Sequence, residues 1–326
     1  MSTRFSRPLR RALLVAAALI TSTFGAGIAS AKSTPVDVKV VGSGGEILAQ
    51  HTQYTDKVSL KTDTKASCFG QGTEGSGDKV KVPGKTALGA VVDGQTADRD
   101  LKPVSVTDAF DFGLGVCGIG GEIAPETGFW YLKSNNVESQ TGGDLTTVKK
   151  GDEVVWFLDT DFADASPAEL DIDSPTKVQL DSEFPVQVFE FAPDGTRTPA
   201  AGVAVTGADQ VTDASGSTTV SGLTKSRTTL TATREGAISD SDGVCARENP
   251  ADCPKQVGGI IGGSGTSDEI EDTDDADDIA MGKGDDKVNT RDGSADDVDC
   301  GGGKKDKVKA DAGDDVAKNC EEVSVR

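Results

Sequence analysis

The stretch Gly282-Lys283-Gly284-Asp285-Asp286-Lys287-Val288 carries the pattern that decides the fold of the C-terminal part of the chain. In it an aspartate stands two residues before a β-branched residue, and this pair occurs six times in residues 258–326. The apolar members are spaced 9, 9, 10, 10 and 8 residues apart. This period predicts short strands separated by tight turns, with the Ile and Val side chains stacked inward. The six aspartates are Asp268, Asp277, Asp286, Asp296, Asp306 and Asp314.

The pattern resembles the calcium-binding nonapeptide repeats of hemolysin-type (RTX) proteins, Gly-Gly-x-Gly-x-Asp-x-apolar-x. The resemblance covers residues 258–320 and implies a parallel β-roll with calcium as cofactor. In such a roll the six aspartates, and Asp285 beside them, present carboxylates that meet backbone carbonyls and form the all-oxygen shell that calcium prefers. Two features depart from the family pattern: residues 271–276 contain no glycine, and Lys304 and Lys305 put ammonium groups in the fifth turn. A disordered acidic tail is the alternative, because residues 258–326 hold 20 acidic and 9 basic side chains.

The N-terminus has the features of an export signal. Residues 1–31 contain four arginines and no acid, then the apolar run 12–20, and they end in Ala29-Ser30-Ala31. This order predicts a secretory signal peptide cleaved before Lys32. General secretion is favoured over the twin-arginine route, and no later apolar segment is long enough to span a membrane. We therefore expect a protein that is secreted, extracellular or loosely associated with the cell surface.

Export changes the interpretation of the cysteines. An even number of cysteines in an oxidising compartment predicts disulfides, and six cysteines allow 15 connectivities. Their grouping along the chain favours one of these, in which each bond stays inside or beside one predicted unit. The expected pairs are Cys68–Cys117, Cys245–Cys253 and Cys300–Cys320.

A first domain is expected at residues 35–160. Val36, Val38 and Val40 alternate with other residues, as in a half-buried strand, and a second strand is expected near residues 47–54. Thr86 is suited to cap a short helix over residues 87–93. Strands are also expected at 129–132 and 153–158, the latter after a Lys150-Gly151-Asp152 turn. Together these segments resemble the transcobalamin C-terminal-like family of small extracellular domains, a resemblance that implies a β-grasp-like fold.

Two aromatic residues of this domain are candidate ligand contacts. Trp130 and Tyr131 are neighbours on an expected strand, so their side chains point to opposite faces of the sheet. One is expected in the core, and the other either lines a ligand surface or packs at a domain contact. In transcobalamin the corresponding domain closes over a corrinoid held by a helical barrel, and this chain has no such barrel. The one histidine, His51, is expected to be solvent-exposed on its strand.

The middle of the chain is expected to hold a linker at 161–174, a second domain at 175–243 and a disulfide-stapled linker at 244–257. In the second domain, short segments in which apolar and polar residues alternate are separated by turn signals about every ten residues. This pattern predicts an antiparallel sandwich. The run Gly202–Gly207 followed by Thr212-Asp213-Ala214-Ser215-Gly216 resembles bacterial immunoglobulin-like modules. Such modules mostly serve as spacers or adhesive units.

Composition narrows the class of function. The formal net charge of −21 makes nucleic-acid binding unfavourable, and 5% aromatic residues with 40 glycines indicate a mainly β, multidomain protein. His51 is the one histidine, so any Ser-His-Asp site would have to use it. No nucleophile motif or phosphate-binding motif is present. The sequence therefore predicts a secreted, non-enzymatic, calcium-binding protein with an extracellular binding or adhesion role and an extracellular partner of unknown identity. The alternatives are a small-molecule-binding protein, corrinoid-like or other, acting through the first domain, and a glycan-acting enzyme that uses carboxylates.

Overall fold

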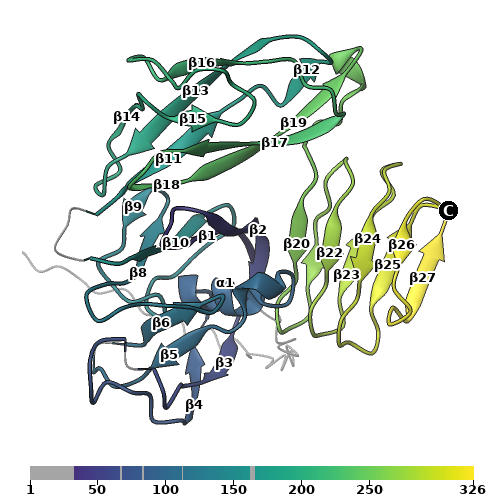
Figure 1. Cartoon of the computed structure of the whole chain (residues 1–326). Coiled ribbons are helices and arrows are strands. Elements are labelled where there is room, and N and C mark those ends of the chain that lie inside the picture. Colours follow the sequence, from purple (N-terminus) through teal and green to yellow (C-terminus); the bar gives the residue numbers. More distant parts are fainter. Residues whose placement is uncertain (1–32, 67, 83, 112, 162–165) are drawn as a thin grey trace, which may run out of the picture. The chain divides into compact units, whose positions relative to one another are not determined.

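The computed structural model describes residues 33–326 apart from residues 67, 83, 112 and 162–165. The predicted signal peptide, residues 1–31, lies outside the described residues. The described chain is mainly β, as its composition predicted, and its strands form several separate sheets (Figure 1).

The first domain is organised around β1 (Thr34–Val41), which lies in the middle of its sheet. Val36, Val38 and Val40 alternate along β1 and are buried, as the sequence pattern predicted. β1 pairs antiparallel with β2 and parallel with β10, and β8 pairs antiparallel with β10. The strands of this part of the sheet are, in order, β2 (Ile47–Thr55), β1, β10 (Glu153–Asp159), β8 (Phe129–Ser134) and β9 (Val137–Glu138).

One helix, α1 (Ala87–Gly94), contacts β1 and β2. The Thr86 hydroxyl accepts a hydrogen bond from the Gly89 N–H at 3.1 Å, which is the N-cap that the sequence predicted. Leu88 and Val91 of the helix are fully buried in the core that α1 shares with this sheet.

The remaining elements of the first domain are short hairpins on the same core. The first disulfide joins Cys117, on one of these strands, to Cys68 in the loop after residue 61, with Cα atoms 5.2 Å apart. The elements are β3 (Val58–Lys61), β4 (Lys79–Val82), the 3-10 turn η1 (Arg99–Leu101), β5 (Ser105–Thr107), β6 (Gly115–Ile119) and β7 (Glu122–Ile123).

The second domain consists of two sheets that share one core, and they are mixed rather than purely antiparallel as expected, because each contains one parallel strand pair. It begins earlier than expected: the segment predicted as a linker at 161–174 contains β11 (Ala168–Asp173), which pairs with β13. One sheet has the order β14-β13-β11-β18 with β16 on β13, and the other β12-β19-β17-β15. The further strands are β12 (Lys177–Gln179), β13 (Phe184–Phe191), β14 (Arg197–Pro199), β15 (Ala204–Val205), β16 (Ser217–Val220), β17 (Arg227–Thr233), β18 (Ala237–Ile238) and β19 (Asp240–Arg247).

A buried network of charged side chains connects the first domain with the second. Lys39 Nζ on β1 lies 2.9 Å from Asp240 Oδ1, 3.2 Å from Glu169 Oε1 and 3.4 Å from Glu153 Oε1. Glu169 on β11 also forms an ion pair with Lys133 on β8, in which Lys133 Nζ lies 3.3 Å from Glu169 Oε2. Burial opposes the charge on Lys39, but the three carboxylates outweigh it and hold the pKa of Lys39 above its usual value. For Lys133 burial outweighs the attraction of Glu169 and lowers the pKa.

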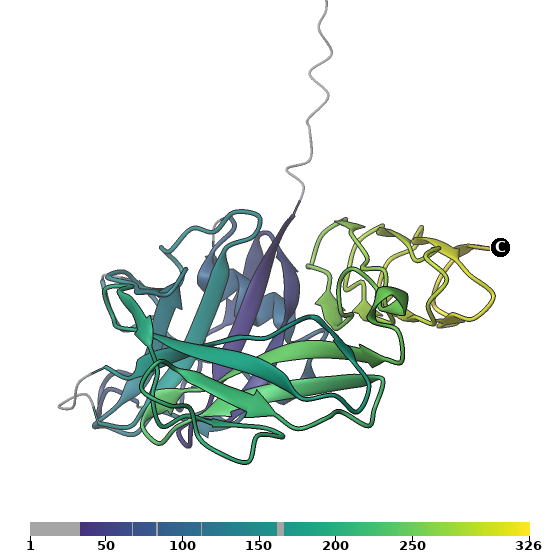
Figure 2. The same ribbon diagram turned by 90° about the horizontal axis from the view of Figure 1, so that it is seen from above.

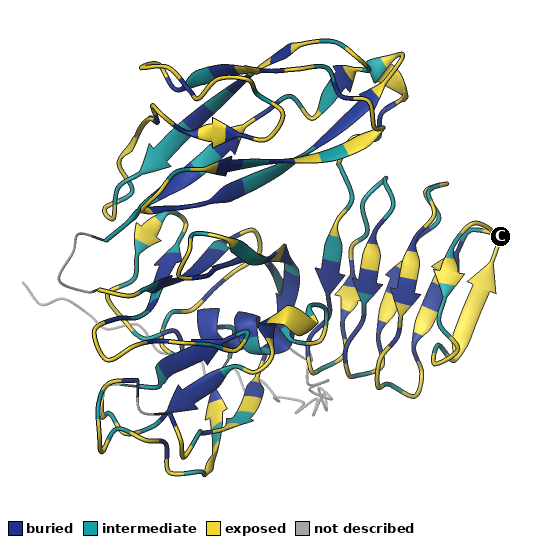
Figure 3. Cartoon of the chain, in the orientation of Figure 1, coloured by how far each residue is buried: buried dark blue, intermediate teal, exposed yellow. Residues whose placement is uncertain are grey.

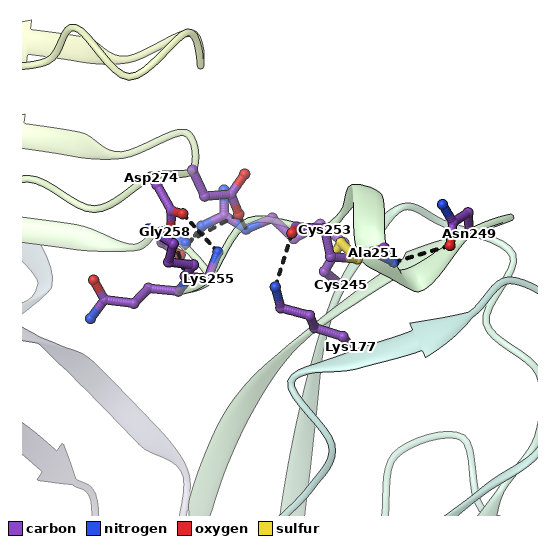
Figure 4. The surroundings of a disulfide bond; sticks show 11 residues. Lys177, Cys245, Asn249, Ala251, Cys253, Lys255, Gly258 and Asp274 are labelled. Atoms are coloured by element: carbon purple, nitrogen blue, oxygen red, sulfur yellow. Dashed lines mark hydrogen bonds and ion pairs between the residues drawn. A yellow bond between two sulfur atoms is a disulfide. The ribbon is translucent and has the colours of Figure 1, made fainter.

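The segment expected as a linker at 244–257 is in large part structured. Cys245 lies on β19, and Cys253 follows the 3-10 turn η2 (Pro250–Asp252). The Cys245–Cys253 bond therefore fastens this turn to the sandwich, and Lys177 Nζ donates to the Cys253 carbonyl at 3.0 Å (Figure 4). Two residues later, the Lys255 N–H donates to Asp274 Oδ2 at 2.8 Å, in the first acidic turn of the C-terminal region.

Residues 258–326, here called the coil region, form two ladders of short parallel strands stacked toward the C-terminus (Figures 1 and 2). Successive strands alternate between the ladders, so that two strands and two turns make one coil. One ladder is β20 (Ile260–Gly262), β22 (Asp278–Ala280), β24 (Asp297–Asp299) and β26 (Asp315–Val316). The other is β21 (Glu269–Ile270), β23 (Lys287–Asn289), β25 (Lys307–Ala310) and β27 (Glu322–Val325).

The predicted apolar residues fill the interior of the coils. Ile270, Ile279, Val288, Val298 and Val308 are buried, and β23, β24 and β25 each place a buried valine between two exposed residues (Figure 3). The Cys300–Cys320 bond fastens the later coils, so all three predicted disulfide pairs are confirmed.

The coil region continues the sheet of the first domain. β20 pairs parallel with β2, and Gln53 Nε2 donates to the Gly263 carbonyl at 2.9 Å. A Cβ atom at Gly262 would lie 2.0 Å from Gln53 Oε1 and 2.8 Å from the Ala97 Cβ, so a larger residue here would displace the buried Gln53 side chain. The expectation that His51 is solvent-exposed is wrong: its ring lies against Gly94 of α1, it is 6% exposed, and burial lowers its pKa.

Candidate metal centre

The predicted aspartates of the coil region stand at the ends of turns, each directly or nearly directly before a strand. Five of them are buried, namely Asp268, Asp277, Asp286, Asp296 and Asp306, while Asp314 is half-buried and Asp285 is exposed. The strand geometry explains this, because the apolar residue two positions later points inward and residues two apart share a face.

These aspartates form two columns of hydrogen bonds that run along the coil stack. In one column Asp286 Oδ1 accepts from the Asp268 N–H at 2.7 Å, and Asp306 Oδ1 accepts from the Asp286 N–H at 2.7 Å. In the other column Asp296 Oδ1 accepts from the Asp277 N–H at 2.9 Å. Each carboxylate thus holds the backbone of the coil before it. The RTX resemblance implies backbone carbonyls around these side chains; instead, backbone N–H groups donate to at least one oxygen of each.

The second oxygen of several of these carboxylates has no partner. Asp286, Asp296 and Asp306 are at most 1% exposed. The Oδ2 atom of each is buried and has no hydrogen-bond partner. Burying an unpaired anionic oxygen is unfavourable unless the group binds a proton or a cation. Burial, opposed by the hydrogen bond from Asp268 and reinforced by the charges of Asp268 and Asp306, raises the pKa of Asp286 to about 7.

One acidic cluster among the described residues has the geometry of a cation site. Asp272, Asp292 and Asp296 each present a carboxylate oxygen, and these oxygens all lie within 4.8 Å of one another. Asp272 follows β21, Asp292 lies one full coil further along the chain, and Asp296 comes just before β24. The cluster is therefore formed by two turns stacked on the same side of the coil region.

The electrostatics of this cluster favour a bound positive charge. Burial raises the pKa of Asp272 to about 8, with further contributions from the neighbouring carboxylates of Asp277, Asp296 and Asp292. Burial and nearby carboxylates also raise the pKa of Asp296, to about 6. Both carboxylate oxygens of Asp272 are buried without a hydrogen-bond partner. A set of carboxylate oxygens suits a hard divalent cation, and calcium in particular accepts six to eight oxygen ligands at about 2.3–2.6 Å.

Sequence reasoning identified Asp296 but missed Asp272 and Asp292. It treated residues 271–276 as a departure from the repeat, because they lack glycine. The signal that was available is the spacing: Asp272 and Asp292 are one coil apart, as are Asp277 and Asp296. The two lysines expected to oppose a metal, Lys304 and Lys305, are exposed.

A groove lies beside one member of the cluster, Asp272. Its volume is about 570 Å³. Asp272 and Asp277 of the coil region line it, together with Asp37, His51 and Tyr54 of the first domain. At its rim Lys150 Nζ and Glu271 Oε2 form an exposed ion pair at 2.6 Å. Asp292 is the exposed member of the cluster, so a cation reaches these carboxylates from solvent on its side, as a metal site requires.

The two aromatic candidates of the first domain lie on opposite faces of the sheet, as predicted. Trp130 is 4% exposed in the main core, whereas Tyr131 stacks on Phe157 with ring centroids 5.2 Å apart. A separate cavity of about 950 Å³ is lined by both residues together with Phe69, Leu145 and others. It is largely apolar and lies apart from the acidic cluster, so the two candidate sites are independent.

Comparison with protein-family models, with curated proteins and with solved structures found no match to this chain. None of the helices that the structure describes is long and apolar enough to cross a membrane. The site itself therefore carries the functional argument.

Proposed function

We propose that this is a secreted, non-enzymatic calcium-binding protein whose coil region holds the ion and which has an extracellular binding or adhesion role. The observation that carries the proposal is the Asp272–Asp292–Asp296 cluster, with its unpartnered buried oxygens and its raised carboxyl pKa values. Three disulfides are compatible with an extracellular location.

The chain's own residues account for the choice of ion. Asp272, Asp292 and Asp296 supply three carboxylates from two stacked turns, and Asp277 adds negative charge beside them. Calcium supplies the positive charge that lets these carboxylates remain ionised side by side. Extracellular calcium modules bind with a Kd of about 10⁻⁴–10⁻³ M, and we expect an affinity in this range.

Calorimetric titration of the full chain with calcium tests this proposal. Asp296→Asn removes one charge from the cluster, and we expect it to weaken binding at least tenfold. Asp297→Asn is the matched control, because Asp297 is the next residue but is exposed on β24. Absence of calcium binding by the wild type at several millimolar, or equal affinities for the two variants, would contradict the proposal.

The cavity of the first domain favours a second candidate function, the binding of a small molecule. Its volume of about 950 Å³ and its lining by Trp130, Tyr131, Trp156 and Phe69 suit an apolar or aromatic ligand. Both tryptophans of the protein line this cavity. Quenching or a spectral shift of tryptophan fluorescence with a panel of apolar ligands therefore tests it, and an unchanged spectrum across the panel would count against it.

A further inference from the structure

One strand of the first domain is paired along only part of one side. On one side β8 pairs with β10 over its whole length, whereas on the other side β9 pairs only with Lys133 and Ser134 (Figure 1). Residues 129–132 of β8 therefore have no strand partner on that side among the residues that the structure describes. We call this segment the free edge of β8. An unpaired strand edge is a template for another strand.

The chain turns away from the free edge just after β9. The Ser139 N–H still donates to the Leu132 carbonyl at 2.8 Å, as the next residue of a continuing hairpin would. Beyond this bond, Ser139 Oγ lies 2.8 Å from Thr146 Oγ1, which lies 3.0 Å from Thr141 Oγ1. The Thr146 N–H also donates to the Gly142 carbonyl at 3.0 Å. This hydroxyl-linked turn leads the chain away from β8, so that β9 ends before it covers the free edge.

The backbone groups of Trp130 point toward the free edge. The Asn135 N–H donates to the Glu153 carbonyl at 3.0 Å, so odd-numbered residues of β8 direct their backbone groups to β10 and even-numbered residues direct theirs away from it. Among the described residues, none donates to the Trp130 carbonyl or accepts from its N–H. Trp130 is only 4% exposed, and buried backbone groups without partners are unfavourable. A ligand with a peptide backbone of its own satisfies both groups at once.

The cavity of about 950 Å³ described above lies along this edge, since Trp130 and Leu132 both line it. In an added strand, the side chain opposite Trp130 lies on the same face of the sheet as the Trp130 side chain. That face is apolar, because Val116 belongs to the same core as Trp130 and Leu114 packs against that core. Leu145 lines the cavity too and is 53% exposed. The position opposite Trp130 therefore suits an apolar side chain.

The other face of the free edge is acidic. Tyr131 points to this face, and Glu138 lies near it on β9, because burial and the charges of Glu138 and Asp159 raise the pKa of the Tyr131 phenol. Glu126 lines the cavity as well and is exposed. No lysine or arginine lines the cavity among the described residues. The positions on either side of the apolar one therefore suit cationic side chains.

We propose that the free edge of β8 binds an extended peptide by strand addition. An apolar side chain of the peptide enters the cavity opposite Trp130, and flanking lysine or arginine side chains lie on the face of Tyr131 and Glu138. The Trp130 N–H donates to a peptide carbonyl, and the Trp130 carbonyl accepts from a peptide N–H. This proposal rests on the cavity of the second candidate function, whose ligand class it names, and it does not depend on calcium binding.

Titration of the full chain with the peptide acetyl-Thr-Lys-Leu-Lys-Thr-amide, followed by tryptophan fluorescence, tests strand addition. We expect a saturable change, because both tryptophans line the cavity. The same peptide with a methyl group on the leucine nitrogen is the matched control. It keeps every side chain but lacks the N–H that pairs with the Trp130 carbonyl, so it should bind at least about tenfold more weakly. Hydrogen exchange of the Trp130 amide should become slower when the unmethylated peptide is bound.

Variants of the protein test the two faces separately. Leu145→Lys places a like charge at the cavity and should weaken binding of the lysine peptide, whereas the matched control Ile123→Lys should not. Ile123 is 54% exposed and does not line the cavity. Glu138→Lys should reverse the charge preference, so that acetyl-Thr-Glu-Leu-Glu-Thr-amide binds better than the lysine peptide. Circular dichroism verifies that each variant is folded.

Four results would overturn strand addition. They are equal binding of the methylated peptide, unchanged exchange of the Trp130 amide, an unchanged charge preference in Glu138→Lys, and no binding of either peptide at millimolar concentrations. In the last case the panel of apolar small molecules separates the two proposals. A fluorescence response to that panel leaves the second candidate function standing and overturns strand addition alone, whereas no response overturns both.

Discussion

Replacing Glu169 with glutamine removes the carboxylate that neutralises two buried lysines at the contact between the first two domains. Glu169 is fully buried and lies 3.2 Å from Lys39 Nζ and 3.3 Å from Lys133 Nζ. Lys39 keeps Asp240 at 2.9 Å, so its charge remains compensated. Lys133 keeps only the Phe191 carbonyl at 3.4 Å among the described groups. The cost of Glu169→Gln is therefore mainly that of leaving Lys133 without a carboxylate.

Two independent arguments give the same magnitude for this loss. Removing one partner of a buried ion pair typically costs about 3–5 kcal/mol. If Lys133 instead loses its proton, the cost at neutral pH is about 1.4 kcal/mol for each of the roughly three pH units below its unfolded pKa, or about 4–5 kcal/mol. The folded pKa of Lys133 is the lower one, so the unfolded state binds more protons and stability rises with pH. The difference in the free energy of unfolding between the wild type and Glu169→Gln should therefore become smaller between neutral pH and about pH 10.

Urea unfolding, followed by tryptophan fluorescence and by far-ultraviolet circular dichroism, measures the loss. Both tryptophans, Trp130 and Trp156, belong to the core of the first domain, so fluorescence reports that domain. Asp171→Asn is the matched control on the same strand, because its ion pair with Arg197 is partly exposed and should be worth less than about 1 kcal/mol. The double variant Glu169→Gln/Lys133→Met should recover most of the loss. A loss below about 1 kcal/mol for Glu169→Gln, or no recovery in the double variant, would refute the reasoning.

Three further predictions concern the other parts of the chain. Burial raises the pKa of Asp93 to about 8, so stability should fall as the pH rises from about 4 to 8, and Asp93→Asn should flatten this dependence in denaturant titrations at several pH values; an unchanged slope would contradict it. Replacing Cys300 and Cys320 together by serine opens a loop with a separation of 20 residues and should cost about 3 kcal/mol in thermal unfolding; a fall in stability of less than about 1 kcal/mol would show that the bond adds little. Gly143→Ala should destabilise by about 1–3 kcal/mol, because its Cβ would lie 2.5 Å from Trp156; an unchanged midpoint would mean that the loop moves freely.

The coil region shows what a local pattern predicts and where it stops. The strand positions and the inward Ile and Val residues follow from the Asp-x-apolar period alone, because each half-coil is specified by a few adjacent residues. The Asp272–Asp292–Asp296 cluster is different, since it joins turns of two coils. Finding it requires comparing positions one full coil apart, and the missing glycines concealed that comparison.

The linker predicted at 161–174 was wrong for a related reason. The sequence of β11, Ala-Glu-Leu-Asp-Ile-Asp, contains three acids and looks like a solvated connection. In the structure Leu170 and Ile172 are buried on one face, and Glu169 is buried because Lys39 and Lys133 neutralise it. Those lysines belong to distant segments of the chain. His51 was misjudged in the same way, because the elements that cover it are far away in sequence.

The pairing of β20 with β2 has a consequence for how the chain folds. It brings together groups 210 residues apart in sequence, such as Gln53 and Gly263, and closing a flexible loop of that length costs about 5 kcal/mol. The sandwich in between shortens this loop once it has formed, so the first coil is laid down late, on an edge that is already in place. Each later coil then needs only its predecessor as a template. The coils should therefore fold one after another in a single direction, from β20 toward β27.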